Sequence, residues 1–376
     1  MAMRDPSTPR AIALHIVPRV FFAMVVAAAL AAGIIGGLLR AGVAFPGSGG
    51  SGWPAQVVGA HAFLMISAFM GTAIGIERAV SVKNPWAYLA PAASALAGLA
   101  MLAGHVGFAS WLATGAAVGF VAVNVVVFER QRAAHTALLV IGASAWWVGN
   151  TLQALGKPPA AVIPWWFSFL VFTIAAERLE MTRLMRRRQG AAATLYACLG
   201  GLLLGSALSA SMPVMGGILY GLSLTGLAAW LMVHDIARRT LRARGLSRYM
   251  AICLLLGYGW LGISGAAWVF SALGWPARDA ALHALGLGFI FSMVLGHVPV
   301  ILPAVTRVQL QFGWIFYVPL ALLHLSLVVR LCFGPFAFSW LSIGAAGNAL
   351  AVVVFAMTMA GSATARARLG SGRRPH

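Results

Sequence analysis

The sequence predicts an all-α fold, a polytopic membrane helix bundle of about 12 transmembrane helices that forms a single domain over residues 1–376. Its composition is the first reason. Of 376 residues, 61% are hydrophobic and only 9% are charged, which is too few charges to cover a soluble protein of this size. The same composition excludes an intrinsically disordered chain and a secreted disulfide scaffold.

The length of the apolar stretches is the second reason. Each has roughly 20 residues, which is what an α-helix needs to cross a hydrocarbon core about 30 Å thick. An even number of crossings returns the chain to its starting side. The expected spans are 18–39, 56–77, 86–105, 107–128, 134–155, 160–178, 190–210, 213–234, 249–273, 279–304, 313–334 and 336–360.

The positive charges show which side that is. The formal net charge is +19, and all but four of the Lys and Arg residues fall on the side of the two termini; the exceptions are Arg40, Lys157, Arg278 and Arg330. Because basic residues favour cytoplasmic loops, both termini are expected in the cytoplasm. The basic loops are short and adjoin span ends, so we expect them to contact anionic lipids at the cytoplasmic face rather than nucleic acid.

Acidic residues recur at the cytoplasmic ends of three spans. Glu77-Arg78, Glu129-Arg130 and Glu177-Arg178 each close a two-helix hairpin. Two interpretations are open, a solvated helix end or an ion pair with a neighbouring basic loop. The sequence places every carboxylate at or outside a span end, which weakens a proton-coupled transporter model, since such proteins usually bury a carboxylate in the membrane.

Histidine is the polar residue that the spans do contain. Helical rise places His61 and His283 at a similar depth near the outer surface, on the spans 56–77 and 279–304, and His105 at the surface beside them. His297 and His324 lie deeper, toward the cytoplasmic side, and could meet each other.

The span 279–304 carries two of these histidines in one pattern. Its residues His283, Gly286, Ile290, Met293 and His297 are separated by steps of three and four, so one face of a regular α-helix should carry all of them. Gly286, beside His283, would leave room for a flat macrocycle.

Buried imidazoles need partners for both ring nitrogens, and two kinds of partner are possible. Two histidines at one depth on different helices suit the axial positions of a haem iron, here expected to be haem b. His297 and His324 could hold a second haem or a copper ion. The alternative is hydrogen bonding between helices, without a metal.

Two arginines near the outer side fit a haem at that depth. Its propionates would point outward, where Arg278 and Arg330 are among the few positive charges. Arg330 is also explained if its side chain simply extends to the membrane surface.

These segments resemble the NnrS family of multi-pass bacterial membrane proteins. The resemblance lies in His61 with the following Phe63, Met65, Phe69 and Gly71, and in the string LHALGLGFIFSMVLGH, which contains His283 and His297. It implies haem and copper as cofactors, a role in tolerance of nitric oxide and nitrosative stress or in metal homeostasis, and a place in the bacterial inner membrane. The outer histidine pair also resembles the low-spin haem site of haem-copper oxidases, but the spans 160–178 and 190–210 contain no histidine for an oxidase-type copper site.

Two other functions are left open by the sequence. A small-solute transporter without a metal could use the prolines Pro299 and Pro303 as bends in a moving helix. A structural subunit would use the histidines only for packing. Whether the chain is an enzyme, and how many copies assemble, does not follow from the sequence.

Overall fold

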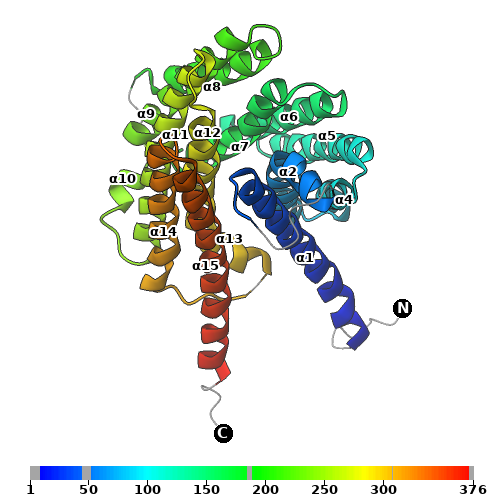
Figure 1. Cartoon of the computed structure of the whole chain (residues 1–376). Coiled ribbons are helices and arrows are strands. Elements are labelled where there is room, and N and C mark those ends of the chain that lie inside the picture. Colours follow the sequence, from blue (N-terminus) through cyan, green and yellow to red (C-terminus); the bar gives the residue numbers. More distant parts are fainter. Residues whose placement is uncertain (1–8, 45–51, 184–188, 307, 372–376) are drawn as a thin grey trace.

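The chain is a bundle of long helices (Figure 1). The structure, a computed structural model, describes residues 9–44, 52–183, 189–306 and 308–371, and these ranges contain helices and connections but no strand. In chain order the helices are α1 (Pro9–Arg40), α2 (Trp53–Phe63), α3 (Gly71–Val82), α4 (Leu89–Leu102), α5 (Val106–Arg130), α6 (Ala134–Ala154), α7 (Pro159–Met181), α8 (Ala191–Leu208), α9 (Pro213–His234), α10 (Ala237–Thr240), α11 (Leu246–Ala272), α12 (Arg278–His283), α13 (Ser292–Thr306), α14 (Tyr317–Val328) and α15 (Phe338–Ser371).

Eleven helical segments in the described ranges are long and apolar enough to cross a membrane. Their bounds follow eleven of the twelve expected spans closely. The remaining expected span, 134–155, corresponds to α6, which is not among the eleven. Polar residues such as His135, Asn150 and Gln153 lower its hydropathy, although it packs between α5 and α7. The all-helical bundle of apolar helices is therefore confirmed, with one fewer span that meets the length and hydropathy expected of a crossing.

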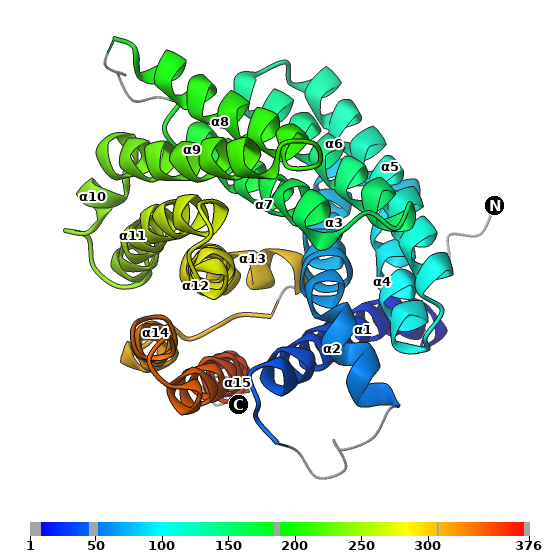
Figure 2. The same cartoon turned by 45° about the horizontal axis from the view of Figure 1, so that its top comes forward.

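Neighbouring helices in the chain are also neighbours in space. α4 packs on α5, α5 on α6, α6 on α7, α8 on α9 and α14 on α15. α1 begins and α15 ends at the same end of the bundle (Figure 1). α7 lies inside the bundle, with α13 beside it (Figure 2), and 83% of its most apolar stretch is buried.

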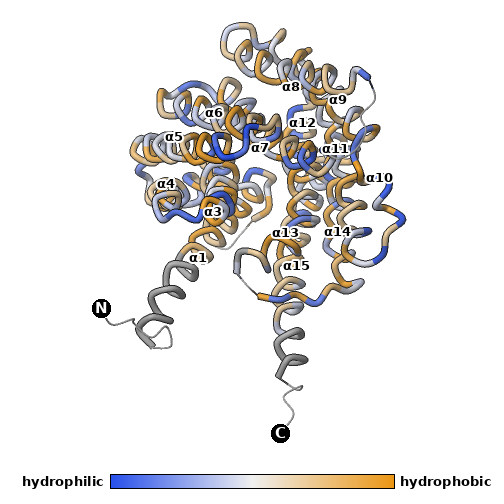
Figure 3. Tube along the Cα trace, turned by 180° about the vertical axis from the view of Figure 1, so that it is seen from behind, coloured by the Kyte–Doolittle hydropathy of each residue, from blue (hydrophilic) through white to orange (hydrophobic). Residues whose placement is uncertain are grey.

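Hydrophilic residues gather in the connections between the helices. Figure 3 shows them on both sides of α10, whereas the long helices are largely apolar. Of the expected basic loop residues, Arg186, Arg187 and Arg188 lie outside the described residues.

Three of the helical segments contain π-helical turns, in which the backbone bonds skip five residues instead of four. One joins α2 to α3 over Leu64–Met70, one joins α12 to α13 over Ala284–Phe291, and one follows α14 over Val329–Phe333. Each adds a residue per turn and so rotates the side chains that follow it relative to a regular α-helix. All three lie beside the cavity described below.

A buried polar network holds the first of these segments in place. Asn150 Oδ1 accepts hydrogen bonds from Ser67 Oγ (2.8 Å) and from Trp166 Nε1 (3.0 Å), and Asn150 Nδ2 donates to the Ala113 carbonyl (3.3 Å). The Ser67 carbonyl accepts from Ser94 Oγ at 2.6 Å. The network therefore ties four helices, α4 to α7, to the π-helical segment.

Replacing the centre of this network should destabilise the bundle. Asn150→Ala leaves the Ser67 hydroxyl and the Trp166 indole without their acceptor, and we expect a loss of about 1–3 kcal/mol in the free energy of unfolding. Thermal unfolding of the purified protein in detergent measures this. The control is Thr151→Ala, because the Thr151 hydroxyl bonds only to the Trp147 carbonyl of its own helix. Equal losses in the two variants would contradict the role given to Asn150.

Candidate functional site

A cavity of about 600 Å³ opens between α1, α2, α7, α12 and α15. This volume is in the range of small-molecule and cofactor sites. Most of its wall is apolar, formed by side chains such as Phe167, Leu170 and Val352. The titratable side chains that line it are Arg40, His61, Arg278, Asp279, His283 and Arg330.

His61 enters the cavity from α2 and is held by α1. Its Nδ1 lies 2.7 Å from the Gly33 carbonyl oxygen. A carbonyl only accepts, so Nδ1 carries the hydrogen and donates it, and the lone pair of the ring is on Nε2. Gly37 lets the helices approach this closely, because a Cβ there would come within 2.8 Å of the imidazole Cε1.

His283 enters from the end of α12 and is held by its own helix. Its Nδ1 lies 2.9 Å from Asp279 Oδ1 and 3.1 Å from the Asp279 carbonyl oxygen. Both neighbours accept, so here too Nδ1 carries the hydrogen and Nε2 has the lone pair. Arg330 fixes the carboxylate in turn, donating from Nε (2.9 Å) and Nη2 (2.8 Å) to its two oxygens.

The two imidazoles are neighbours at the cavity. Their ring centroids are 6.4 Å apart and their planes differ by 28°. Among the described residues, no hydrogen bond is made by either Nε2, and both rings line the cavity. The sequence prediction that His61 and His283 share one depth and one site is therefore matched by their positions in the structure.

The expected stripe on the span 279–304 is only partly present. His283, Gly286 and Ile290 line the cavity, as expected. A Cβ on Gly286 would meet the Phe167 ring at 3.8 Å, which is an ordinary contact. The glycine is therefore not needed for a close helix crossing, and its effect is to leave space beside His283. The stripe ends there, because the π-helical turn Ala284–Phe291 rotates Met293 and His297 away from the cavity.

The predicted pairing of His297 with His324 is wrong. His297 Nε2 accepts from Arg178 Nη2 (2.8 Å), and its Nδ1 donates to the Met293 carbonyl (2.7 Å). His324 Nδ1 accepts from Trp260 Nε1 (2.8 Å), and its Nε2 lies 3.5 Å from Ser292 Oγ. Both nitrogens of each ring are thus engaged with different partners, which leaves neither ring a lone pair for a shared ion.

The two predicted cationic residues have different surroundings. Arg330 is buried and paired with Asp279, so it neither reaches the surface nor stays free for an anion. Arg278 is exposed, lines the cavity and makes no ion pair with a described residue. Arg40, which the sequence placed on the same side, also lines the cavity and donates to the Val58 carbonyl.

Other candidate ligands lie elsewhere. His105 is exposed at the start of α5 and does not line the cavity. Across the described part of the chain, no three His, Cys, Asp or Glu side chains come together as they would around a metal ion. His61 and His283 line one cavity together, and two histidines are the ligands that a haem with two axial imidazoles uses.

Sequence reasoning missed the residue that holds His283. Asp279 precedes it by four positions, which is one helical turn, and an aspartate one turn before a histidine is a pattern that could have indicated this contact. The partnership of Asp279 with Arg330 spans 51 residues and required the structure.

Residues 19–364 match a family model that is described as Domain of unknown function (DUF8744). The chain belongs to the DUF8744 family. The match takes in all three π-helical segments and both cavity histidines of this DUF8744 protein. Searches of curated proteins and of solved structures gave no match.

The effects of substituting Arg330 and Asp279, which form an ion pair next to His283, on the free energy of unfolding should be coupled. Arg330→Met and Asp279→Asn should each lower the free energy of unfolding by about 1–3 kcal/mol, between the values for exposed and fully buried pairs, because the Asp279 side chain is partly exposed. The double variant should lose less than the sum, since the second substitution removes a group that the first left unpaired. Unfolding in mixed micelles measures this.

The control for this cycle is Arg278→Met, which removes an exposed arginine of the same cavity that has no carboxylate partner among the described residues. Its effect should stay within about 0.5 kcal/mol. Additive losses from Arg330→Met and Asp279→Asn would contradict the coupling.

Proposed function

We propose that this protein is an integral membrane haem protein that holds haem b in the cavity, with His61 and His283 as the axial ligands. The observation that supports this best is the state of the two rings. Each donates from Nδ1 to an acceptor behind it, so each has its Nε2 lone pair available to a metal on the cavity side.

The separation of the rings fits one iron between them. With each nitrogen about 2 Å from the metal, two axial imidazoles have ring centroids roughly 6 Å apart. The observed value is 6.4 Å. Both rings line the cavity of about 600 Å³, whose apolar walls could accommodate a macrocycle.

The carboxylate behind His283 supports a role for this ring as a metal ligand. A carboxylate that accepts from the far nitrogen of a metal-binding histidine orients the ring and raises its basicity. Asp279 has this place, and Arg330 keeps it in position with two hydrogen bonds. His61 donates instead to the backbone carbonyl of Gly33, which is uncharged and therefore a weaker acceptor than the Asp279 carboxylate.

The charges at the cavity suit a ligand with two carboxylates. Arg40 and Arg278 are exposed and unpaired with carboxylates in the described ranges, so they would receive the haem propionates. Arg330, which the sequence suggested for this role, would instead support His283.

Haem in this site would supply a redox-active iron for electron transfer. The chain's own residues would orient the ring plane, exclude water with apolar walls and balance the propionate charge. The resemblance to the NnrS family connects this with nitric oxide and nitrosative stress. We do not extend the copper expectation to His297 and His324, because their nitrogens are engaged with other side chains.

We further propose that the bundle lies in the bacterial inner membrane with both termini in the cytoplasm. The apolar helices support a place in a membrane. The basic residues at the span ends on the side of the two termini, such as Arg130 and Arg248, support a cytoplasmic position for that side. These residues would contact anionic lipid headgroups.

Haem content of purified variants tests the ligand assignment. After haem-replete expression the wild type should show a Soret band and near-stoichiometric haem by pyridine haemochrome. His61→Ala and His283→Ala should each lose haem, with affinity falling by more than the roughly 10–100-fold that loss of a second-shell partner costs.

The matched control is His324→Ala, which removes a buried histidine that bonds to Trp260 and lies outside the cavity. It should keep its haem. A wild type without haem would contradict the proposal, and so would equal losses in all three variants. Solute uptake into proteoliposomes that is unaffected by His61→Ala and His283→Ala would then favour a transporter.

A further inference from the structure

A second group of charged side chains lies apart from the cavity. We call it the inner polar cluster and define it as Glu77, Arg78, Glu177, Arg178, Asp235, Tyr258 and His297. It comes from α3, α7, α11, α13 and the residue that follows α9. None of its members lines the cavity.

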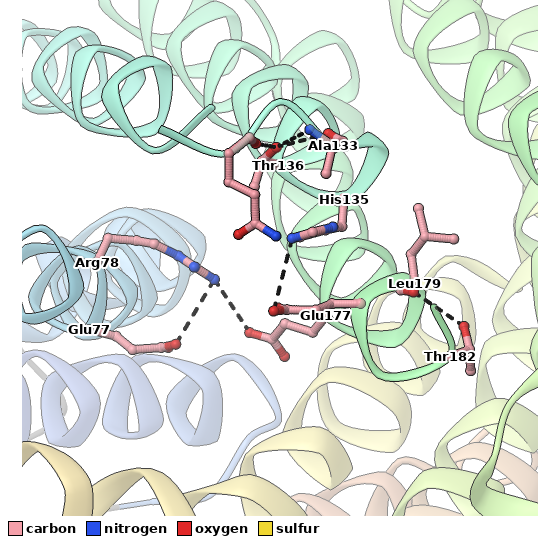
Figure 4. Close-up of polar contacts among 10 residues, drawn as sticks. Glu77, Arg78, Ala133, His135, Thr136, Glu177, Leu179 and Thr182 are labelled. Carbon is pink, nitrogen blue, oxygen red and sulfur yellow. Dashed lines mark hydrogen bonds and ion pairs between the residues drawn. The ribbon is translucent and has the colours of Figure 1, made fainter. Parts of the chain in front are cut away.

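One side of the cluster is built around Arg78. Its Nη2 lies 3.9 Å from Glu77 Oε1 and 3.7 Å from Glu177 Oε1, and Figure 4 shows the guanidinium between the two carboxylates. The sequence placed Glu77 at a span end, whereas α3 continues to Val82. Two of the three Glu-Arg repeats therefore meet each other inside the bundle and do not pair with a basic loop.

The other side is built around Arg178, which is only 5% exposed. Its Nη2 donates to His297 Nε2 at 2.8 Å. A guanidinium cannot accept, so His297 Nε2 has no hydrogen, and its Nδ1 donates to the Met293 carbonyl. The hydrogen bonds thus fix His297 as a neutral imidazole.

Asp235 is 4% exposed and completes the cluster. Its Oδ1 accepts from the Ala237 amide at 2.7 Å. Its Oδ2 is buried as well, and the buried Tyr258 hydroxyl is the neighbouring side-chain group that can share a hydrogen bond with the carboxyl. Arg178, Tyr258 and His297 are the ionisable groups that act on it from the helices packed around it.

The charges of the cluster do not balance. Glu77, Glu177 and Asp235 give three negative charges when ionised, and Arg78 and Arg178 give two positive charges. His297 contributes none, because it is neutral. One negative charge is left over. It is most costly on Asp235, which is 4% exposed, whereas the Glu77 and Glu177 side chains are 31% and 27% exposed. One bound proton removes it.

Exposed residues lie close to Asp235 in the sequence, in α10. Asp235 is followed by the buried Ala237 and then by Arg238 and Arg239, which are exposed. On the opposite side, Phe291 at the cavity wall precedes His297 by about 9 Å of helix. Chain connections thus link the cluster to the exposed arginines of α10 through Asp235 and to the cavity wall through α13.

We propose that the inner polar cluster is a proton-binding site in which the Asp235 carboxyl holds one exchangeable proton taken from the water beside α10. Binding forms one O–H bond on a buried oxygen of the Asp235 carboxylate and leaves the charge of the cluster balanced. The site does not depend on haem.

The electrostatics of Asp235 agree with this assignment. Burial raises the pKa of its carboxyl, and Arg178, the Ala237 amide, the Tyr258 hydroxyl and His297 oppose that rise only in part. A raised pKa means that the folded protein binds the proton more tightly than the unfolded chain. Stability is then fully present below the unfolded pKa and falls as pH rises toward the folded pKa.

Infrared difference spectra of the full-length protein between mildly acidic and alkaline pH test the proposal. The wild type should show, at neutral pH, the carbonyl stretch of a protonated carboxyl that shifts in D₂O. Asp235→Asn should lose this band while keeping the acceptor for the Ala237 amide. Glu129→Gln, which removes an exposed carboxylate of the third repeat, should keep it. A missing band in the wild type, or a band that persists in Asp235→Asn, would overturn the proposal.

Melting temperature as a function of pH gives a second readout. The wild type should lose stability as pH rises, whereas Asp235→Asn should lose less, so that the variant gains on the wild type at alkaline pH. Parallel curves would overturn the proposal. Both readouts apply to the protein with or without haem, so their failure is distinguishable from a failure to bind haem.

Discussion

The arrangement of the cavity depends on the hydrogen bonds behind its two imidazoles. In a low-dielectric interior a histidine must satisfy both ring nitrogens or lose stability. His61 and His283 each satisfy Nδ1 with an acceptor, the Gly33 carbonyl and the Asp279 carboxylate, and each leaves Nε2 to the cavity. This choice of nitrogen distinguishes them from His297 and His324, whose two nitrogens are both engaged.

Irregular helices surround the cavity and give it its shape. The π-helical turn Leu64–Met70 begins three residues after His61, the turn Ala284–Phe291 begins directly after His283, and the turn Val329–Phe333 contains Arg330. Such turns cost backbone hydrogen-bond geometry and are often found at functional sites. In α13, the residues that follow the turn Ala284–Phe291, such as His297, face away from the cavity. The inner polar cluster is therefore a separate site.

The sequence predicts much of this fold but only part of the site. Spans follow from apolar length, and the shared depth of His61 and His283 follows from helical rise, so both could be predicted. The contact of His297 with Arg178 could not, because a π-helical turn changes the helix face and the partners are 119 residues apart. The pairing of Arg330 with Asp279 depends on how α12 and the end of α14 pack, which one sequence does not specify.

The central claim is that His61 and His283 bind one iron from opposite sides. The low-temperature electron paramagnetic resonance spectrum of the oxidised, purified full chain tests it most directly, because two axial imidazoles produce a low-spin ferric iron. The account predicts that low-spin signal. A high-spin ferric signal, or no haem signal in protein that is folded and was expressed with sufficient haem, would contradict it.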